Sequence, residues 1–446
     1  MAYHPLRATL LLAVLLPCAG TAWPMDLLQA YEAAMSNDAG ILAARATAAA
    51  GREHEPQALA QLRPSLTASI SSSHNQLNST APNAWGESKS TDTGYPSSNQ
   101  TVTLRQPLYR SYLTAQYRQA QAQTQDADDV LAQEEQDLAV RVCSAYFEAL
   151  LNQEQLALVL AQQTAYQTQL AAARKSLELG AGTRTDVDEA QARLDMSVAN
   201  EIEARQNGDY TLHQLHTLVN QPIDGLARLA PDALALATSQ PDTVQSWIET
   251  AERTSHHLRS LQAQVESARA EVDKAQSGHL PTLDATAQWS RSVSESTTNL
   301  QSSYVNNSVG LQLSIPLYAG GQVSSGVRQA QALLVRAQQL LEAGRRELAV
   351  NVHKEFRAVT ESMARAQALE QALRSAGQLV LSNQKSVKGG SRTLVDVLNA
   401  EQQRVQVLRD LAQSRAMHLL ARIRLLALVG RANAPEIAAI NQLLTN

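Results

Sequence analysis

The order of apolar and polar residues along the chain predicts long helices separated by short strands. An Ala-rich stretch over about 27–62 is typical of a helix, which Pro64 ends. Apolar residues then alternate with polar ones, which indicates a strand over about 66–74. A polar stretch over about 74–100 is expected to be an exposed loop, and it is followed by a second strand over about 100–109.

The second half of the chain shows the strand pattern more clearly, over about 283–293 and 305–317. Apolar side chains on one face, polar ones on the other and aromatic rings near the ends are typical of a membrane barrel strand. Two ordinary hairpins packed on helices would give a similar pattern. The apolar face comprises Leu283, Ala285, Ala287 and Trp289 in one strand and Val309, Leu311, Leu313, Ile315 and Leu317 in the next.

Two long helices are expected after these strands. Residues 110–179 contain no Pro or Gly, and 325–388 contain no Pro. Each helix would be about 100 Å long and must pack lengthwise against other helices. Shorter helices, such as 185–219, would cover the long ones. A coiled-coil seam with apolar residues three and four apart is predicted at Val327, Ala330, Leu334, Ala337, Leu341, Gly344 and Leu348.

Landmarks recur in the same order in both halves, at offsets of about 209 to 217 residues. The chain is therefore predicted to contain one architecture twice, over 23–230 and 231–446. The matching landmarks are Gln61–Leu66 with Gly278–Leu283, Gln106–Tyr109 with Ile315–Tyr318, Phe147 with Phe356, and Gly180 with Gly390.

The first 22 residues are predicted to be a signal peptide. Arg7 precedes an apolar run that is too short to span a bilayer, and small residues follow at 20–22. After cleavage only Cys143 remains, so no intramolecular disulfide is expected. The 446 residues carry a formal net charge of −5, and this balance offers no basic surplus for a nucleic-acid partner.

Motifs that would indicate an enzyme, a cofactor or a metal are missing from the sequence. The stretch from Gly180 to Arg184 has no phosphate-loop lysine, and His256 and His257 are adjacent rather than spaced for a shared metal. The sequence therefore predicts a protein that is not an enzyme, with no cofactor. A periplasmic adaptor with a long helical hairpin is a rival hypothesis. A soluble coiled-coil scaffold is another, but it would not explain the recurring strands.

Four strands per chain lead to a prediction about assembly. Four strands cannot close a barrel, and an open sheet edge cannot lie in lipid because its backbone groups would be unpaired. The strands are therefore expected to be pooled between copies. A dimer would give a barrel filled by side chains, whereas a trimer with twelve strands leaves a lumen. The predicted fold is mainly α-helical, with a coiled-coil tunnel joined to a pooled transmembrane β-barrel.

The turns between the long and short helices form two predicted tips, near 180–186 and 388–396. Glycines at 180, 182, 389 and 390 supply the turn chemistry, together with the polar Thr185. Under rotational symmetry Asp396 would form a ring of carboxylates, and Arg392 could pair with Asp186 of a neighbouring tip. Alternatively, these charges are solvated turn residues or complement the helix dipoles.

In these motifs the chain resembles the outer-membrane efflux protein family, and within it the TolC-like outer-membrane components of type I secretion. The resemblance covers nearly the whole mature chain. It is carried by Gly278–Asp284, Pro316–Gly321, Gln329–Gln331, Ser391–Leu398 and Val198–Glu201.

The resemblance implies a homotrimeric channel in the outer membrane whose helical tunnel lies in the periplasm. The implied function is a passive conduit for type I protein secretion, or alternatively for multidrug efflux. Implied partners are outer-membrane lipid, an inner-membrane ABC or RND transporter, a periplasmic membrane-fusion adaptor, and an exported polypeptide or drug.

The resemblance also implies residue roles at the gate. Asp186 and Arg392 match partners in a network that holds the tip closed, and Asp396 matches an inner carboxylate ring. Two positions depart from the family's pattern: Val387 stands in place of a latch tyrosine, and Asn399 in place of a second aspartate.

Overall fold

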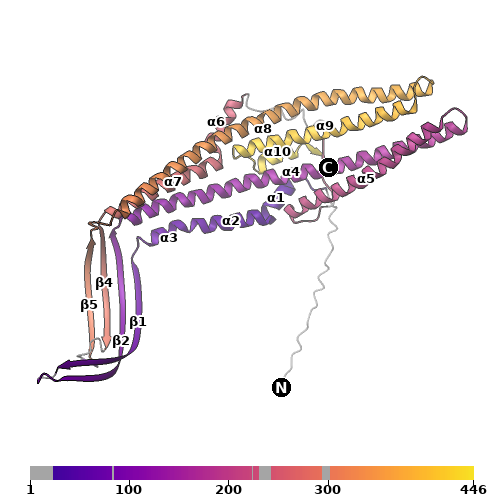
Figure 1. The fold of residues 1–446 in the computed structure, drawn as a ribbon. Coiled ribbons are helices and arrows are strands. Elements are labelled where there is room, and N and C mark those ends of the chain that lie inside the picture. The colour runs from indigo at the N-terminus through magenta and orange to yellow at the C-terminus, as the bar shows by residue number, and fades with distance from the viewer. Residues whose placement is uncertain (1–23, 83–84, 224, 231–242, 294–301, 446) are drawn as a thin grey trace, which may run out of the picture.

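The computed structural model describes residues 24–82, 85–223, 225–230, 243–293 and 302–445. The predicted signal peptide, 1–22, and the expected start of the second repeat at 231 lie outside the described residues. The molecule is elongated, with a sheet at one end and helical hairpins at the other (Figure 1). Within the described ranges, no helix has both the length and the apolar content needed to span a bilayer.

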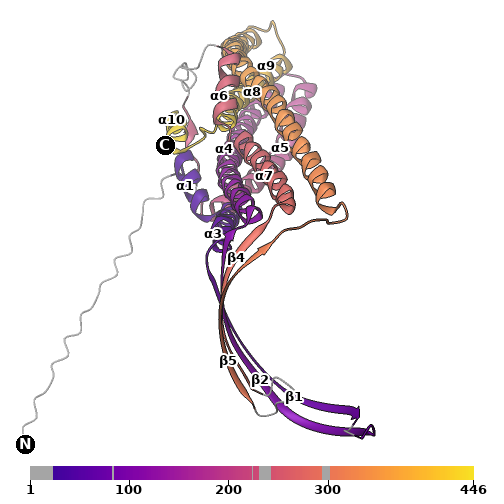
Figure 2. The ribbon, with the colours of Figure 1, turned by 90° about the vertical axis from the view of Figure 1, so that its left-hand side faces the viewer.

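The sheet contains four antiparallel strands in the order β1-β2-β4-β5. It is strongly curved along the strands (Figure 2). The central β2–β4 pair joins the two halves of the chain, and β1 and β5 form the two edges. The strands are β1 (Ser65–Pro82), β2 (Ser88–Tyr109), β4 (Thr282–Val293) and β5 (Ser303–Ser314).

The expected loop over about 74–100 is wrong for most of its length, because β1 and β2 continue through it to Pro82 and from Ser88. The alternation of apolar residues disappears there, so the period-2 signal is lost. Polar cross-strand pairs support the ladder instead. The hydroxyls of Ser73 and Ser97 lie 2.7 Å apart, and Ser90 Oγ donates to Asn78 Oδ1 over 2.9 Å.

The two strand hairpins pair in the same register. Ser65 lies opposite Arg105 in the first hairpin, and Thr282 lies opposite Ser314 in the second. Thr282 lies 217 residues after Ser65, and Ser314 lies 209 residues after Arg105. These are the offsets at which the landmarks recur in the sequence. The repeat therefore extends to individual paired residues of the ladder. β5 ends before the predicted 317, because Pro316 has no N–H for a ladder.

The predicted helix over 27–62 is interrupted at two places that the sequence pattern did not indicate. Asp38 is extended and its carboxylate accepts a hydrogen bond from the backbone N–H of Ile41 over 3.0 Å, so a new helix begins there. The segments are α1 (Leu27–Asn37), α2 (Ala39–Arg52) and α3 (His54–Ala60), and the second half has α6 (Val244–Thr254) and α7 (His256–Gln276) at comparable places.

Two helical hairpins form the rest of the molecule. The first hairpin consists of α4 (Ser111–Glu178) and α5 (Arg184–Val219), and the second of α8 (Gln322–Lys388) and α9 (Leu394–Leu428). The predicted seam on α8 is confirmed, since Ala330 and Leu348 are buried while Arg328 and Arg346 are exposed. A Cβ on Gly344 would lie 2.5 Å from Leu261 of α7, so this glycine lets the two helices approach closely.

The main core lies midway along the helices, where the two ends of the described chain also meet. The short strands β3 (Arg228–Leu229) and β6 (Leu444–Thr445) pair there, and α10 (Ala434–Asn441) packs beside α1. Tyr146 of α4 is fully buried, and its hydroxyl lies 3.0 Å from the carbonyl oxygen of Met25 and 3.1 Å from that of Ala227. This core fixes the point from which both hairpins project.

Three charged residues, here called the junction triad, connect the sheet to the helices. Asp284 of β4 is 4% exposed. Its carboxylate accepts hydrogen bonds from Arg110 Nε over 2.8 Å, from Arg110 Nη2 over 2.6 Å and from Arg105 Nη2 over 2.8 Å. Because Arg110 directly precedes α4, the triad fixes the angle at which that helix leaves the sheet.

We expect Asp284→Asn to destabilise the protein, because both guanidinium groups lose their charged acceptor at a buried position. The expected loss is about 2 kcal/mol, which would lower the unfolding midpoint by a few degrees. Circular dichroism of the purified protein during heating measures this. Glu342→Gln is the control, since it breaks the exposed Arg346–Glu342 pair and should change little. Equal midpoints for both variants would contradict the role of the triad.

Candidate functional site at the hairpin tips

The two tips are built with the same backbone geometry. Gly180 and Gly390 both have φ of +74°, a left-handed conformation that favours glycine. Ser176 O accepts from Ala181 N over 2.9 Å in the first tip, and Ser386 O accepts from Ser391 N over 3.0 Å in the second. The turns satisfy the last carbonyls of the long helices and reverse the chain within a few residues.

The other two tip glycines have different reasons to be small. A Cβ on Gly182 would lie 3.0 Å from Ser176 Cβ and 3.1 Å from Leu177 N, so a larger residue would press on the end of α4. Gly389 has a φ of −85° and ends α8 without a left-handed conformation.

Each tip also carries a Thr-x-x-Asp capping box. Asp186 Oδ2 accepts from Thr183 N over 3.0 Å and from Thr183 Oγ1 over 2.6 Å. Asp396 Oδ2 accepts from Thr393 N over 3.0 Å and from Thr393 Oγ1 over 2.9 Å. The backbone hydrogen bond from Thr393 holds the pKa of Asp396 below its usual value, with help from the threonine hydroxyl and nearby Arg392. The Asp396 carboxylate is therefore ionised at neutral pH.

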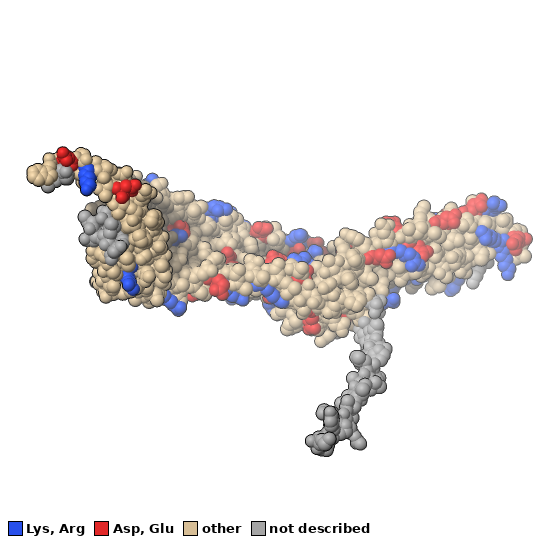
Figure 3. Space-filling model, turned by 90° about the horizontal axis from the view of Figure 1, so that it is seen from below, with Lys and Arg blue, Asp and Glu red and all other residues tan. Residues whose placement is uncertain are grey.

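The remaining predicted gate residues lie close to these boxes. Thr185 and Asn399 are exposed within the first two turns of α5 and α9, and Val387 is half-buried near the end of α8. Arg392 is exposed, and its Nη1 lies 3.9 Å from Asp396 Oδ1. The single chain thus brings Arg392 to Asp396 and leaves Asp186 on the other tip. Acidic and basic side chains gather at this far end of the helices (Figure 3).

Two tip residues were not predicted from the sequence. Asn383 of α8 is 4% exposed, and its Nδ2 donates to the carbonyl oxygen of Asp396 over 2.9 Å, which ties α8 to the start of α9. Arg193 of α5 donates to Asn399 and Gln402 of α9. A polar residue on a helix face gives no sign of a partner more than 200 positions away. Only the fold shows these contacts.

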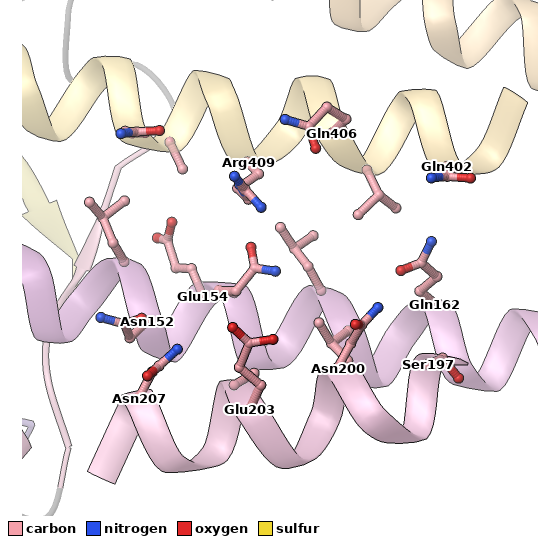
Figure 4. Close-up of a pocket in the computed structure, with 18 of the residues that line it drawn as sticks. Asn152, Glu154, Gln162, Ser197, Asn200, Glu203, Asn207, Gln402, Gln406 and Arg409 are labelled. Carbon is pink, nitrogen blue, oxygen red and sulfur yellow. The ribbon is translucent and has the colours of Figure 1, made fainter. Parts of the chain in front are cut away.

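A groove of about 570 Å³ lies between the first hairpin and α9 (Figure 4). Its walls are rich in amides, among them Asn152, Gln162, Asn200 and Gln406. Glu154 points into this groove, and burial raises the pKa of its carboxyl above the usual value although Arg228 and Arg415 oppose the shift. Polar groups that line open space indicate loose packing between the two hairpins.

Among the described residues there is no group of three or more His, Cys, Asp and Glu side chains that could hold a metal ion. The one cysteine in the described ranges, Cys143, is fully buried, and burial raises the pKa of its thiol to about 12.

Comparison with known proteins gives two consecutive matches to one family. The model of the outer membrane efflux protein family matches residues 30–221 and again 247–431. The chain is 34% identical to the proteases secretion protein PrtF of Dickeya chrysanthemi, over 97% of this chain and 94% of that protein. It is 34% identical to the alkaline protease secretion protein AprF of Pseudomonas aeruginosa, over 91% and 84% of the two chains.

Solved structures share the fold. The outer-membrane channel OprN superposes with a TM-score of 0.78 and 17% identity, over 91% of this chain and 90% of that chain. The outer membrane protein VceC of Vibrio cholerae gives a TM-score of 0.76 and 18% identity, over 92% and 99%. The chain therefore belongs to the outer membrane efflux protein family and is the outer-membrane channel of an export system, with its helical part in the periplasm.

Proposed function

We propose that this channel is the exit duct of a type I secretion system and carries a protease or a similar polypeptide out of the cell. The 34% identity to PrtF over nearly the full length of both chains is the observation that carries the proposal. This role requires an inner-membrane ABC transporter and a periplasmic adaptor as partners. The transporter would use the ATP, because the sequence of this chain contains no phosphate-loop motif. The role is passive conduction rather than catalysis.

A strain that lacks this gene should lose its secreted protease from the culture medium and retain it in the cells. Complementation with the intact gene should restore the secreted activity. Drug susceptibility of the same strains provides the comparison. Normal secretion together with increased drug sensitivity would contradict the proposal and favour multidrug efflux.

We also propose that three copies pool their sheets into a twelve-stranded barrel. Two features support this. Among the described strands of a single chain, β1 and β5 each pair on one side only, and an open edge is unfavourable in lipid. In addition, apolar side chains on β1 and β5 are exposed, including Ile70 at 81% and Val309 at 89%. A surface of this kind fits a lipid environment.

The repeat specifies which residues should meet between copies. Within the chain, Leu104 of β2 lies opposite Ala287 of β4. In the repeat, Leu104 is equivalent to Leu313 of β5, at an offset of 209 residues. Ala287 is equivalent to Ile70 of β1, at an offset of 217 residues. If neighbouring copies pair as the two halves do, Leu313 of one copy lies opposite Ile70 of the next.

The double variant Ile70→Cys, Leu313→Cys should therefore form disulfide-linked dimers and trimers on oxidation, visible on denaturing gels without reductant. Cysteines in this arrangement lie within disulfide reach, since facing Cα atoms in a sheet are about 4.5–5.5 Å apart. Ile70→Cys, Val309→Cys is the matched control, because it displaces the register by four residues. Equal cross-linking in both variants, or none in either, would contradict the pooled barrel.

For the gate, we propose that Asp396 from three copies forms a carboxylate ring, and that Arg392 pairs with Asp186 of the neighbouring copy. The ionised state of Asp396 and its position on the first turn of α9 support a ring that attracts cations. Asn399, one turn further along α9, is neutral, and Val387 is apolar. The ring would therefore be single, and the latch between neighbouring copies would depend mainly on Arg392.

Asp396→Asn should weaken the block of the channel by a trivalent cation by on the order of tenfold, equivalent to about 1.4 kcal/mol. Single-channel recording in planar lipid bilayers measures the block. Asp188→Asn removes an exposed carboxylate near the other tip, which forms an i,i+4 ion pair with Arg184 and belongs to neither the ring nor the latch, and should keep the block. A block that is unchanged in Asp396→Asn would exclude the ring.

A further inference from the structure

The two hairpins are held together weakly beyond the central core. They project as two separate arms toward their tips (Figure 1), and the amide-lined groove lies between the first hairpin and α9 (Figure 4). Among the described side chains of the tip half, the hydrogen bonds that cross from one hairpin to the other all start from one residue, Arg193.

Arg193 uses its whole guanidinium group for this contact. Nη1 donates to Gln402 Oε1 over 2.5 Å, and Nη2 donates to Asn399 Oδ1 over 2.8 Å. Asn399 and Gln402 are three residues apart on α9, so they lie on the same side of the helix. The planar fork of an arginine fits two such neighbouring acceptors, which a lysine could not contact with fixed geometry.

A third hydrogen bond orients the side chain. Nε donates to Glu189 Oε1 over 3.0 Å, one turn earlier on α5. The Arg193 side chain is 23% exposed, less than the other paired arginines of α5, Arg184 at 80% and Arg205 at 57%. Arg193 also lines the groove between the first hairpin and α9, together with its acceptor Gln402.

The contact is not repeated in the second half of the chain. At the tips the repeat offset is 210, which places Gln403 at the position equivalent to Arg193 and Ala192 at the position equivalent to Gln402. A trimer would therefore carry one such contact per chain, between the two hairpins of the same copy.

We propose that Arg193, with its acceptors Asn399 and Gln402, is a clasp that keeps the tip closed and must break when the channel opens. The proposal rests on the proposed function as a gated duct. Arg193 is a positioning residue: it holds α9, which carries Asp396, against the first hairpin. Because both acceptors are neutral amides, the clasp is weaker than an ion pair and can be released by a modest force from a docking partner.

Arg193→Gln should raise the single-channel conductance of the purified protein in planar bilayers several-fold, because the second hairpin is then free to move outward. Arg205→Gln is the matched control. Arg205 forms an i,i+4 ion pair with Glu201 on the same helix and, within the described ranges, no hydrogen bond to α9, so this variant should conduct like the wild type. Circular dichroism and the oligomer band verify that both variants are folded.

A double-mutant cycle separates the clasp from a merely structural role. Asn399→Asp gives Arg193 a charged acceptor and should lower the conductance in the wild-type background. In the Arg193→Gln background the same substitution should lack this closing effect, so the decrease in conductance should be larger in the wild-type background. A carboxylate at 399 also alters ion selectivity, but that effect would be the same in both backgrounds.

The outcomes distinguish the clasp from the channel function. If the wild type forms pores and Arg193→Gln conducts like Arg205→Gln, Arg193 is only a surface ion pair with Glu189 and the clasp is wrong. Equal effects of Asn399→Asp in both backgrounds would also overturn it. If the wild type forms no pores, the proposed function fails and the clasp fails with it.

Discussion

Unpaired backbone groups at the two edges of a four-stranded sheet are the constraint on which the rest of the structure depends. Each edge strand carries a row of N–H and C=O groups, and leaving them without partners in lipid costs several kcal/mol per group. The central β2–β4 pair shows how one half of the chain satisfies the other. In the proposed trimer, further copies close the remaining edges, and the helices that continue from the strands follow the same circular arrangement.

The duplication explains why the halves are alike in geometry and different in chemistry. The junction triad of Asp284, Arg105 and Arg110 lies where the two halves meet within one chain. In the proposed trimer, the repeat places Thr67, Ser314 and Ala319 at the corresponding junction between copies, and none of them is charged. The contact within a chain therefore has a buried ion pair that fixes its geometry, while the proposed contact between copies would depend on the ladder and on packing.

Much of this architecture could be predicted from the sequence because long periodic signals are strong. The absence of Pro and Gly over about 70 residues predicts α4, and the seam on α8 follows from its apolar spacing. The strands beyond His74 were missed because Ser, Thr and Asn support a ladder through polar pairs without alternation. The break at Asp38 was missed because a single capping carboxylate within an Ala-rich stretch is a weak signal.

At the tips, the sequence identified charged residues but not their contacts. Asp186 and Asp396 are each held in a fixed position by a capping box with the preceding Thr. The backbone hydrogen bond also keeps the pKa of Asp396 below its usual value, so capping is compatible with the proposed carboxylate ring. In the proposed gate such fixed charges discriminate between ions, but within the described part of a single chain they do not join the two hairpins. In a single chain that connection is made by Arg193 through neutral amides. In the proposed gate, ion selectivity depends on Asp396, whereas closure depends on Arg392 and Arg193, so a substitution can alter one property without removing the other.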